Sequence, residues 1–109
     1  MAQVITWTNL DLPDLHNYMK QLVADSTGRQ EMTVISVVEK LDSLKFGVFD
    51  SGIFAEIGYV GTADTYRTQK IVQFVTNKLQ QKYMLSKLQV YVTFSELNRF
   101  NVCLNGTQM

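Results

Sequence analysis

The residue types that most often carry out enzyme chemistry are scarce in this chain. His16 is its one histidine and Cys103 its one cysteine. A single cysteine excludes an internal disulfide and a cysteine-rich metal site, and a single histidine excludes a histidine cluster. The pair also argues against Ser-His-Asp or Cys-His catalysis. We interpret His16 as a solvated side chain and Cys103 as a small packed hydrophobe, and we expect neither a metal nor a cofactor.

Two other residues have side chains that could contact a ligand. Arg29 stands directly after Gly28, whose position is typical of a helix C-terminus. Its guanidinium could bind a carboxylate, or it could simply complement the negative end of the helix dipole. Tyr91 lies in an apolar run, where tyrosine is as often a core or interface residue as a ligand.

Composition limits the classes of protein to which the chain could belong. Its 109 residues suit a single domain, 1–109, and 46% hydrophobic with 18% charged residues is a globular composition. Ten basic and ten acidic residues give zero net charge. The chain therefore lacks the broad positive electrostatic field that nucleic-acid binders usually have. No apolar run approaches the length of a membrane span, and the N-terminal residues do not form a secretory signal. We therefore expect a cytoplasmic protein without nucleic-acid or membrane partners.

Hydrophobic periodicity predicts a strand, a helix and a strand in the first half. Residues 3–8 are β-branched and aromatic, and they read as a strand. Pro13 occupies a first-turn position for a helix that Gly28 ends. The apolar stripe of this helix is Leu15, Tyr18, Met19, Leu22 and Val23. Residues 32–38 have strong β propensity and form the second predicted strand.

The second half repeats this order. Residues 53–60 are predicted as a strand, and Gly61 and Thr62 then open a helix with Thr62 as its N-cap. The apolar face of this helix comprises Ile71, Phe74, Val75 and Leu79. Residues 88–94 form the last main strand, and 44–49 are predicted as a short edge strand.

Two β-α-β units predict an α+β fold, in which a four-stranded sheet carries two helices on one face. Side chains that point to both faces of the sheet are largely apolar in residues 34–38. A sheet buried on both faces shows this pattern. Since the chain is too short for a third layer, we expect a neighbouring chain to cover the second face.

Several short segments, taken in their order and spacing, resemble a known family. They are residues 4–10, 26–29, 37–38, 46–47, 57–58 with Gly61, 90–92 and 105–107. Over essentially its whole length, the chain is similar to macrophage migration inhibitory factor and its tautomerase relatives. The resemblance implies a homotrimer whose three sheets wrap into a central barrel. It also implies proton transfer on keto–enol substrates such as phenylpyruvate, with an N-terminal proline as the base.

Ala2 stands at the position of that proline, and this is the main departure from the family. A freed alanine amine is primary and has an ordinary pKa of roughly 7.7–8.0, so it would be a weak base. If Met1 is retained, the nitrogen of Ala2 is an ordinary peptide nitrogen without basicity.

The resemblance carries over other pocket residues one by one. Arg29 stands where the family has its substrate-carboxylate lysine, and the backbone N–H of Ile57 matches a substrate contact. Tyr91 matches the tyrosine that the neighbouring subunit contributes, and Thr93 replaces a common asparagine. Met109 falls near the mouth, where aromatic residues are usual.

Three functions remain open at this point. The first is a cytokine-like or regulatory trimer with weak or no tautomerase activity, which binds a small keto acid or a protein receptor. The second is an active phenylpyruvate-type tautomerase (an isomerase) that uses the N-terminal amine or a polarising pocket. The third is a generic α+β module that binds a small molecule or a protein. Family members can be exported without a signal peptide, so export also stays open.

Overall fold

Two β-α-β units follow one another in the computed structural model, which describes residues 1–98, 103–104 and 107–108. The main elements are β1 (Ala2–Thr8), α1 (Leu15–Thr27), β2 (Val34–Lys40), β3 (Ile53–Val60), α2 (Thr65–Tyr83) and β4 (Val90–Leu97). A short pair, β5 (Cys103–Leu104) and β6 (Thr107–Gln108), follows. Two 3-10 turns, Glu31–Thr33 and Lys87–Gln89, occupy residues predicted as strand starts, so β2 and β4 begin two residues later than expected.

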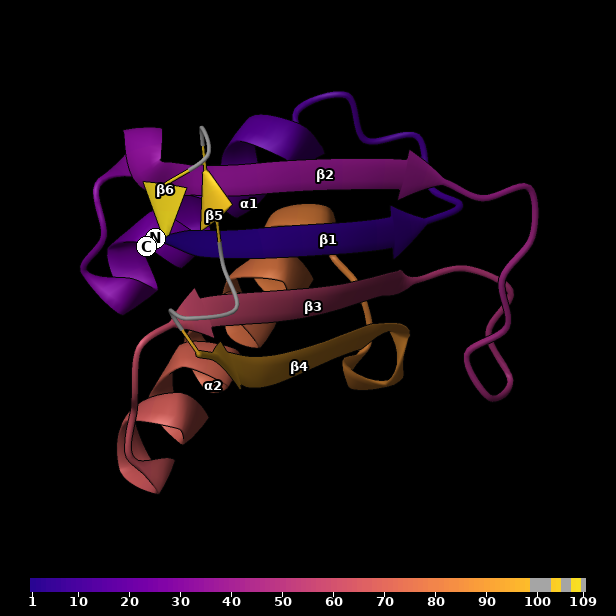
Figure 1. Cartoon of the computed structure of the whole chain (residues 1–109). Helices are drawn as coiled ribbons and strands as arrows, with labels where there is room; N and C mark the ends of the chain where they lie inside the picture. The colour runs from indigo at the N-terminus through magenta and orange to yellow at the C-terminus, as the bar shows by residue number, and fades with distance from the viewer. Residues whose placement is uncertain (99–102, 105–106, 109) are drawn as a thin grey trace.

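The four long strands form one mixed sheet in the order β2-β1-β3-β4, with both helices behind the same face (Figure 1). β1 is parallel to β2, β3 is parallel to β4, and the central pair β1 and β3 is antiparallel. At one end of the sheet Ala2 lies opposite Val34 and Tyr59, and at the other end Thr8 lies opposite Ile53. The predicted α+β architecture is confirmed.

Helix α1 forms because its apolar residues recur with the helical period. Its buried residues are Leu15, Met19, Leu22, Val23, Ala24 and Thr27. The helix begins two residues after Pro13 and ends at Gly28, whose φ of 71° lies in the left-handed region that favours glycine. This turn directs Arg29 away from the helix and toward the end of β3.

The start of α2 differs from the sequence prediction, which placed the N-cap at Thr62. Asp64 is the N-cap, and its Oδ1 accepts a hydrogen bond of 2.7 Å from the backbone N–H of Arg67. Aspartate ranks above threonine as a capping residue, and its charge also suits the positive end of the helix dipole. Residues 61–64 are therefore a loop between β3 and α2.

The predicted edge strand after β2 is a loop that holds one isolated bridge between Phe46 and Phe49. The side chain of Asn9 anchors the loop. Its Nδ2 donates to the carbonyl of Asp50 at 2.6 Å, and its Oδ1 accepts from the backbone N–H of Gly52 at 3.3 Å. Side-chain hydrogen bonds thus satisfy backbone groups that a strand ladder would otherwise pair.

The two faces of the sheet differ in burial. On the helix side, alternate residues of β1 and β3 are fully buried in the core, among them Ala2, Val4, Ile53, Ala55 and Ile57. The other face carries a row of three aromatic rings, Trp7, Phe54 and Tyr91, whose neighbouring centroids are 5.4 and 5.2 Å apart. Ile35 and Val37 on the same face are 46% and 43% exposed, so apolar surface reaches the solvent there.

Candidate functional site

The first residues of the chain lie between two strands at one end of the sheet. The side chain of Ala2 is 1% exposed and points into the core. The carbonyl of Met1 accepts a hydrogen bond of 3.1 Å from the backbone N–H of Val60. The terminal amine is therefore placed beside the end of β3, while the alanine side chain contributes only packing.

The amine of Met1 is a titratable group of this region whose pKa is shifted. Its pKa is lowered from the ordinary value of 8.0, mainly by burial and further by the positive charge of Arg29. Both causes disfavour the ammonium form. A larger share of this amine is therefore uncharged near pH 7 than in a free peptide, as a general base requires.

Arg29 is half-buried and held by backbone and aromatic contacts. Its Nη2 donates to the carbonyl of Val60 at 3.0 Å, and its Cζ lies 4.7 Å from the ring centroid of Tyr59. Its Nε is buried and has no hydrogen-bond partner. In the described part of the chain, no carboxylate forms an ion pair with Arg29. The guanidinium is thus oriented but not neutralised, which suits the binding of a carboxylate.

The sequence prediction missed two residues of this site, Tyr59 and Arg67. Tyr59 is buried in β3, and Arg67, in the first turn of α2, places its Cζ 5.5 Å from the same ring centroid. A cation in the first turn of a helix is unfavourable toward the helix dipole. That conflict was the signal in the sequence that could have singled out Arg67.

Tyr91 and Thr93 do not meet Arg29 within the chain. On β4 they lie opposite Phe54 and Glu56, whereas the site lies at the Tyr59 end of β3. Their side chains belong to the face of the sheet turned away from the helices, and Tyr91 is 53% exposed. One chain therefore brings together the N-terminus and Arg29 but leaves these two residues several positions away.

The remaining predicted residues are Ile57 and Met109. Ile57 is 1% exposed, with its side chain in the core, and it lies opposite Val4 and Phe94 in the sheet. It is two residues from Tyr59 on the same strand. Met109 lies outside the described residues.

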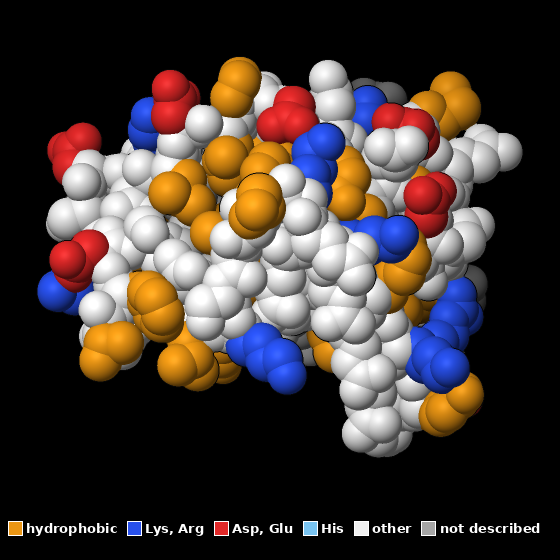
Figure 2. All heavy atoms as spheres, turned by 180° about the vertical axis from the view of Figure 1, so that it is seen from behind, with side chains coloured by type: hydrophobic (Ala, Val, Ile, Leu, Met, Phe, Trp, Pro, Cys, Tyr) orange, Lys and Arg blue, Asp and Glu red, His pale blue; other side chains and the backbone are white. Residues whose placement is uncertain are grey.

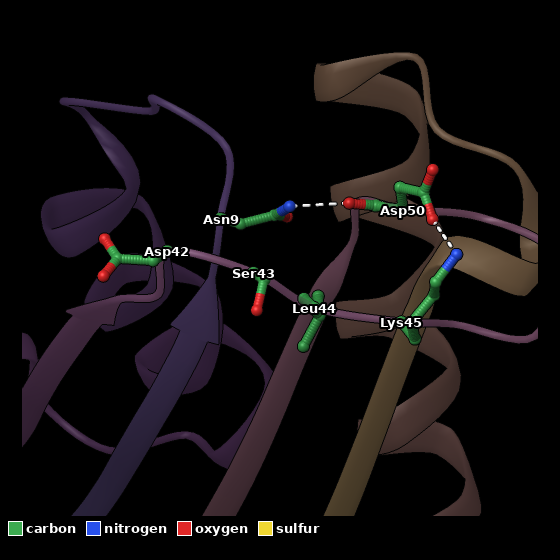
Figure 3. A pocket seen from close by; sticks show the side chains of 6 residues that line it. All are labelled: Asn9, Asp42, Ser43, Leu44, Lys45 and Asp50. Atoms are coloured by element: carbon green, nitrogen blue, oxygen red, sulfur yellow. Dashed lines mark hydrogen bonds and ion pairs between the residues drawn. The ribbon is translucent and has the colours of Figure 1, made fainter.

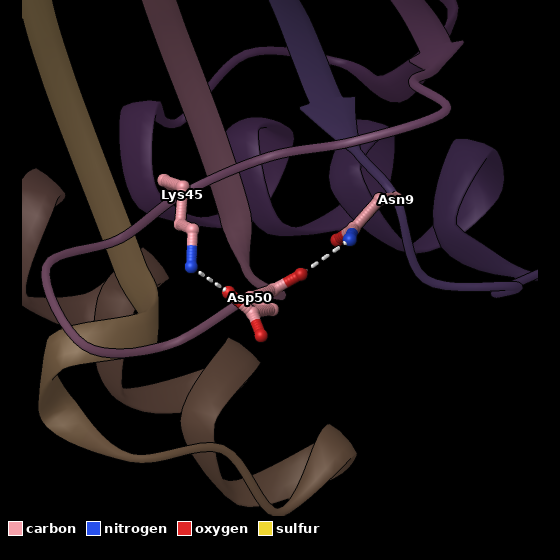
Figure 4. A network of polar contacts seen from close by, with 3 residues as sticks. All are labelled: Asn9, Lys45 and Asp50. Atoms are coloured by element: carbon pink, nitrogen blue, oxygen red, sulfur yellow. Dashed lines mark hydrogen bonds and ion pairs between the residues drawn. The ribbon is translucent and has the colours of Figure 1, made fainter.

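A hollow of about 540 Å³ lies at the opposite end of the sheet. Its lining residues are Asn9, Asp42, Ser43, Leu44, Lys45 and Asp50 (Figure 3). Lys45 forms an ion pair with Asp50, whose carbonyl in turn accepts from Asn9 (Figure 4). Because Asp50 neutralises Lys45 and both side chains are exposed, this hollow attracts an anion less than Arg29 does.

Other kinds of site are not found in the described part of the chain. No group of three or more His, Cys, Asp or Glu side chains there could hold a metal ion. None of the helices described has the length and apolar character needed to cross a membrane.

Solved structures of other proteins share this architecture. The macrophage migration inhibitory factor of Trichinella spiralis matches with a TM-score of 0.85 at 20% identity, over 98% of this chain and 99% of that chain. That of Giardia lamblia is 26% identical, with a TM-score of 0.68 over 87% and 98%. Pt0534, in a crystal structure inactivated by 2-oxo-3-pentynoate, matches with a TM-score of 0.82 at 12% identity over 95% and 92%. No family model and no curated protein sequence matches the chain. The chain thus has the fold of the macrophage migration inhibitory factors and their tautomerase relatives.

Proposed function

We propose that the chain is a trimeric member of the macrophage migration inhibitory factor and tautomerase superfamily, which binds small keto acids through Arg29 and has weak or no tautomerase activity. The observation that carries this proposal is an oriented guanidinium without a carboxylate partner in the described part of the chain, beside a terminal amine of lowered pKa. Binding to a protein receptor, as a cytokine-like or regulatory trimer, belongs to the same proposal.

The geometry of Arg29 supports binding of a carboxylate. Arginine presents five N–H donors in a planar fork, and the carbonyl of Val60 takes one donor of Nη2. The stacking on Tyr59 keeps the fork in one orientation, so less side-chain entropy is lost when a ligand binds. Pt0534, a protein of the same fold, is inactivated by 2-oxo-3-pentynoate, which belongs to the class of ligand proposed here.

The residue at position 2 supports weak activity. Proton abstraction from carbon needs a base whose pKa lies near the working pH. Ala2 provides no secondary amine, and its nitrogen lies in a peptide bond while Met1 is present. The one observation that favours an active tautomerase, the alternative function, is the lowered pKa of the Met1 amine.

A trimer would explain why Tyr91 and Thr93 are distant from Arg29 in one chain. A neighbouring subunit could present them to the site, as the resemblance implies. The exposed apolar side chains of Ile35 and Val37 support burial of the same sheet face in an assembly. Sedimentation analysis tests this directly: a stable monomer at micromolar concentration would contradict the trimer.

The functional experiment combines a phenylpyruvate tautomerase assay, the intact mass of the same sample, and a binding titration with phenylpyruvate. We expect activity near background, and binding that Arg29→Gln weakens at least tenfold, because a charge-assisted hydrogen-bonded pair is lost. Lys78→Gln removes a charge from an exposed position on α2 and should change nothing. A clear keto–enol rate that Arg29→Gln abolishes would favour the active tautomerase instead.

A second variant tests the rest of the pocket. Ala2→Pro, produced so that Met1 is removed, should create or raise tautomerase activity because it restores a secondary amine at the terminus. Removing Met1 also deprives the N–H of Val60 of its hydrogen bond, which costs about 1 kcal/mol, so the thermal midpoint is recorded alongside. A folded variant that remains at background would show that the pocket has diverged beyond its base.

A further inference from the structure

Two guanidinium groups from different elements converge on the ring of Tyr59. The Cζ of Arg29, which follows α1, is 4.7 Å from the ring centroid, and the Cζ of Arg67, in the first turn of α2, is 5.5 Å from it. Because both distances are measured to the same centroid, the two Cζ atoms are no farther apart than the sum of these distances. Lys and Arg side chains also gather over the N-terminal part of α2 on the helix side of the molecule (Figure 2).

The hydrogen bonds of the two arginines hold them in place without neutralising them. Arg29 donates to the carbonyl of Val60, and the Nη2 of Arg67 donates to the carbonyl of Thr27 at 2.8 Å. No carboxylate in the described part of the chain forms an ion pair with either arginine. Asp25 lines a hollow of about 230 Å³ together with Arg67, yet it forms no ion pair with it.

The loop between β3 and α2 keeps the space beside these groups open. Gly61 has a φ of +130°, which residues with a Cβ rarely adopt, and a Cβ there would lie 3.3 Å from the ring of Tyr59 and 3.6 Å from Nη2 of Arg29. A side chain at this position would therefore press on the ring of Tyr59 and occupy the space next to the guanidinium. Glycine leaves Arg29 accessible next to the ring that Arg67 also contacts.

We infer that Arg67 is a second anion-binding residue of the Arg29 site, so that the preferred ligand is a dicarboxylic 2-oxo acid. The inference rests on the proposed function, because it assumes that one carboxylate binds Arg29. Two like charges close together repel one another, and the amine of Met1 adds to the positive potential. A ligand with one carboxylate neutralises one guanidinium, whereas a ligand with two neutralises both.

The test compares two acids with the same five-carbon chain, 2-oxoglutarate and 2-oxopentanoate, which differ in the terminal carboxylate. Affinity is measured by NMR titration of the full chain at low ionic strength. We expect 2-oxoglutarate to bind at least tenfold more tightly, because a charged hydrogen bond is gained. Arg67→Gln should bring the ratio of the two dissociation constants close to one. Lys78→Gln, which removes an exposed charge farther along α2, should leave the ratio at its original value.

A lysine variant separates charge from structure, since Arg67 also caps α1 through Thr27. Arg67→Lys keeps the charge, so it should retain most of the preference even where Arg67→Gln lowers the thermal midpoint. An unchanged ratio in Arg67→Gln would overturn the inference while leaving the proposed function intact, provided that Arg29→Gln weakens the binding of both acids. If neither acid binds the unmodified protein, the proposed function fails and this inference with it.

Discussion

Two threonines of β1 provide a matched test of how buried hydroxyl groups contribute to stability. Thr6 and Thr8 lie two residues apart, point into the same core, and are 0% and 2% exposed. The Oγ1 of Thr6 has no hydrogen-bond partner. The Oγ1 of Thr8 donates to the carbonyl of Gly52 at 2.7 Å and accepts from the backbone N–H of Leu10 at 3.1 Å.

Replacing each threonine by valine should therefore have opposite effects. Thr6→Val removes a buried, unsatisfied hydroxyl, whose desolvation costs about 1–3 kcal/mol, and adds a buried methyl worth about 0.8 kcal/mol. Together these two terms predict that the free energy of unfolding rises by about 2–4 kcal/mol. Thr8→Val leaves the carbonyl of Gly52 and the N–H of Leu10 without this partner, so we expect a loss of about 1–3 kcal/mol.

Urea denaturation followed by the fluorescence of Trp7, the one tryptophan of the chain, measures both effects. Protein concentration is held constant across variants, because assembly contributes to apparent stability. Equal destabilisation by the two substitutions would refute the reasoning, since it would mean that the hydroxyl of Thr6 also has a partner in the folded protein.

Three further predictions concern a helix cap and two titrating groups. Asp64→Ala should lower stability by about 1 kcal/mol, whereas Thr62→Ala should leave it nearly unchanged; thermal unfolding of the two variants checks which residue caps α2. The Met1 amine should titrate below 8.0, and Arg29→Gln should raise its pKa only in part because burial is the larger cause, as NMR of the terminal amine would show. Since the folded protein then binds this proton less tightly than the unfolded chain, stability should rise as the pH increases from the folded pKa toward 8.0. Burial, and then a hydrogen bond to a carboxylate, raises the pKa of Tyr83 above its ordinary value of 10.0, so ultraviolet titration of Tyr83→Phe should lack one late-ionising phenol.

Local sequence patterns were enough to predict the main elements and their order, because periodicity is a local property. A largely apolar run predicted β3 at 53–60, and a stripe with helical spacing predicted α1, which ends where Gly28 adopts a positive φ. The position of Arg29 just past that helix could also be read from its neighbours. Local signals failed at the start of α2, where Thr62 and Asp64 were both possible N-caps and Asp64 is the one that caps the helix. They also failed in the loop before β3, where hydrogen bonds from the distant Asn9 replace the predicted edge strand.

Which side chains meet one another depends on the tertiary structure. Tyr59 and Arg67 are eight positions apart and Arg29 is thirty before Tyr59, yet the three come together because both helices cross back over one face of the sheet. Tyr91 belongs to a neighbouring strand of the same sheet but lies on its other face. Contacts of this kind depend on how the crossovers pack and where the loops end, and these are properties of the whole fold that no short stretch of sequence contains.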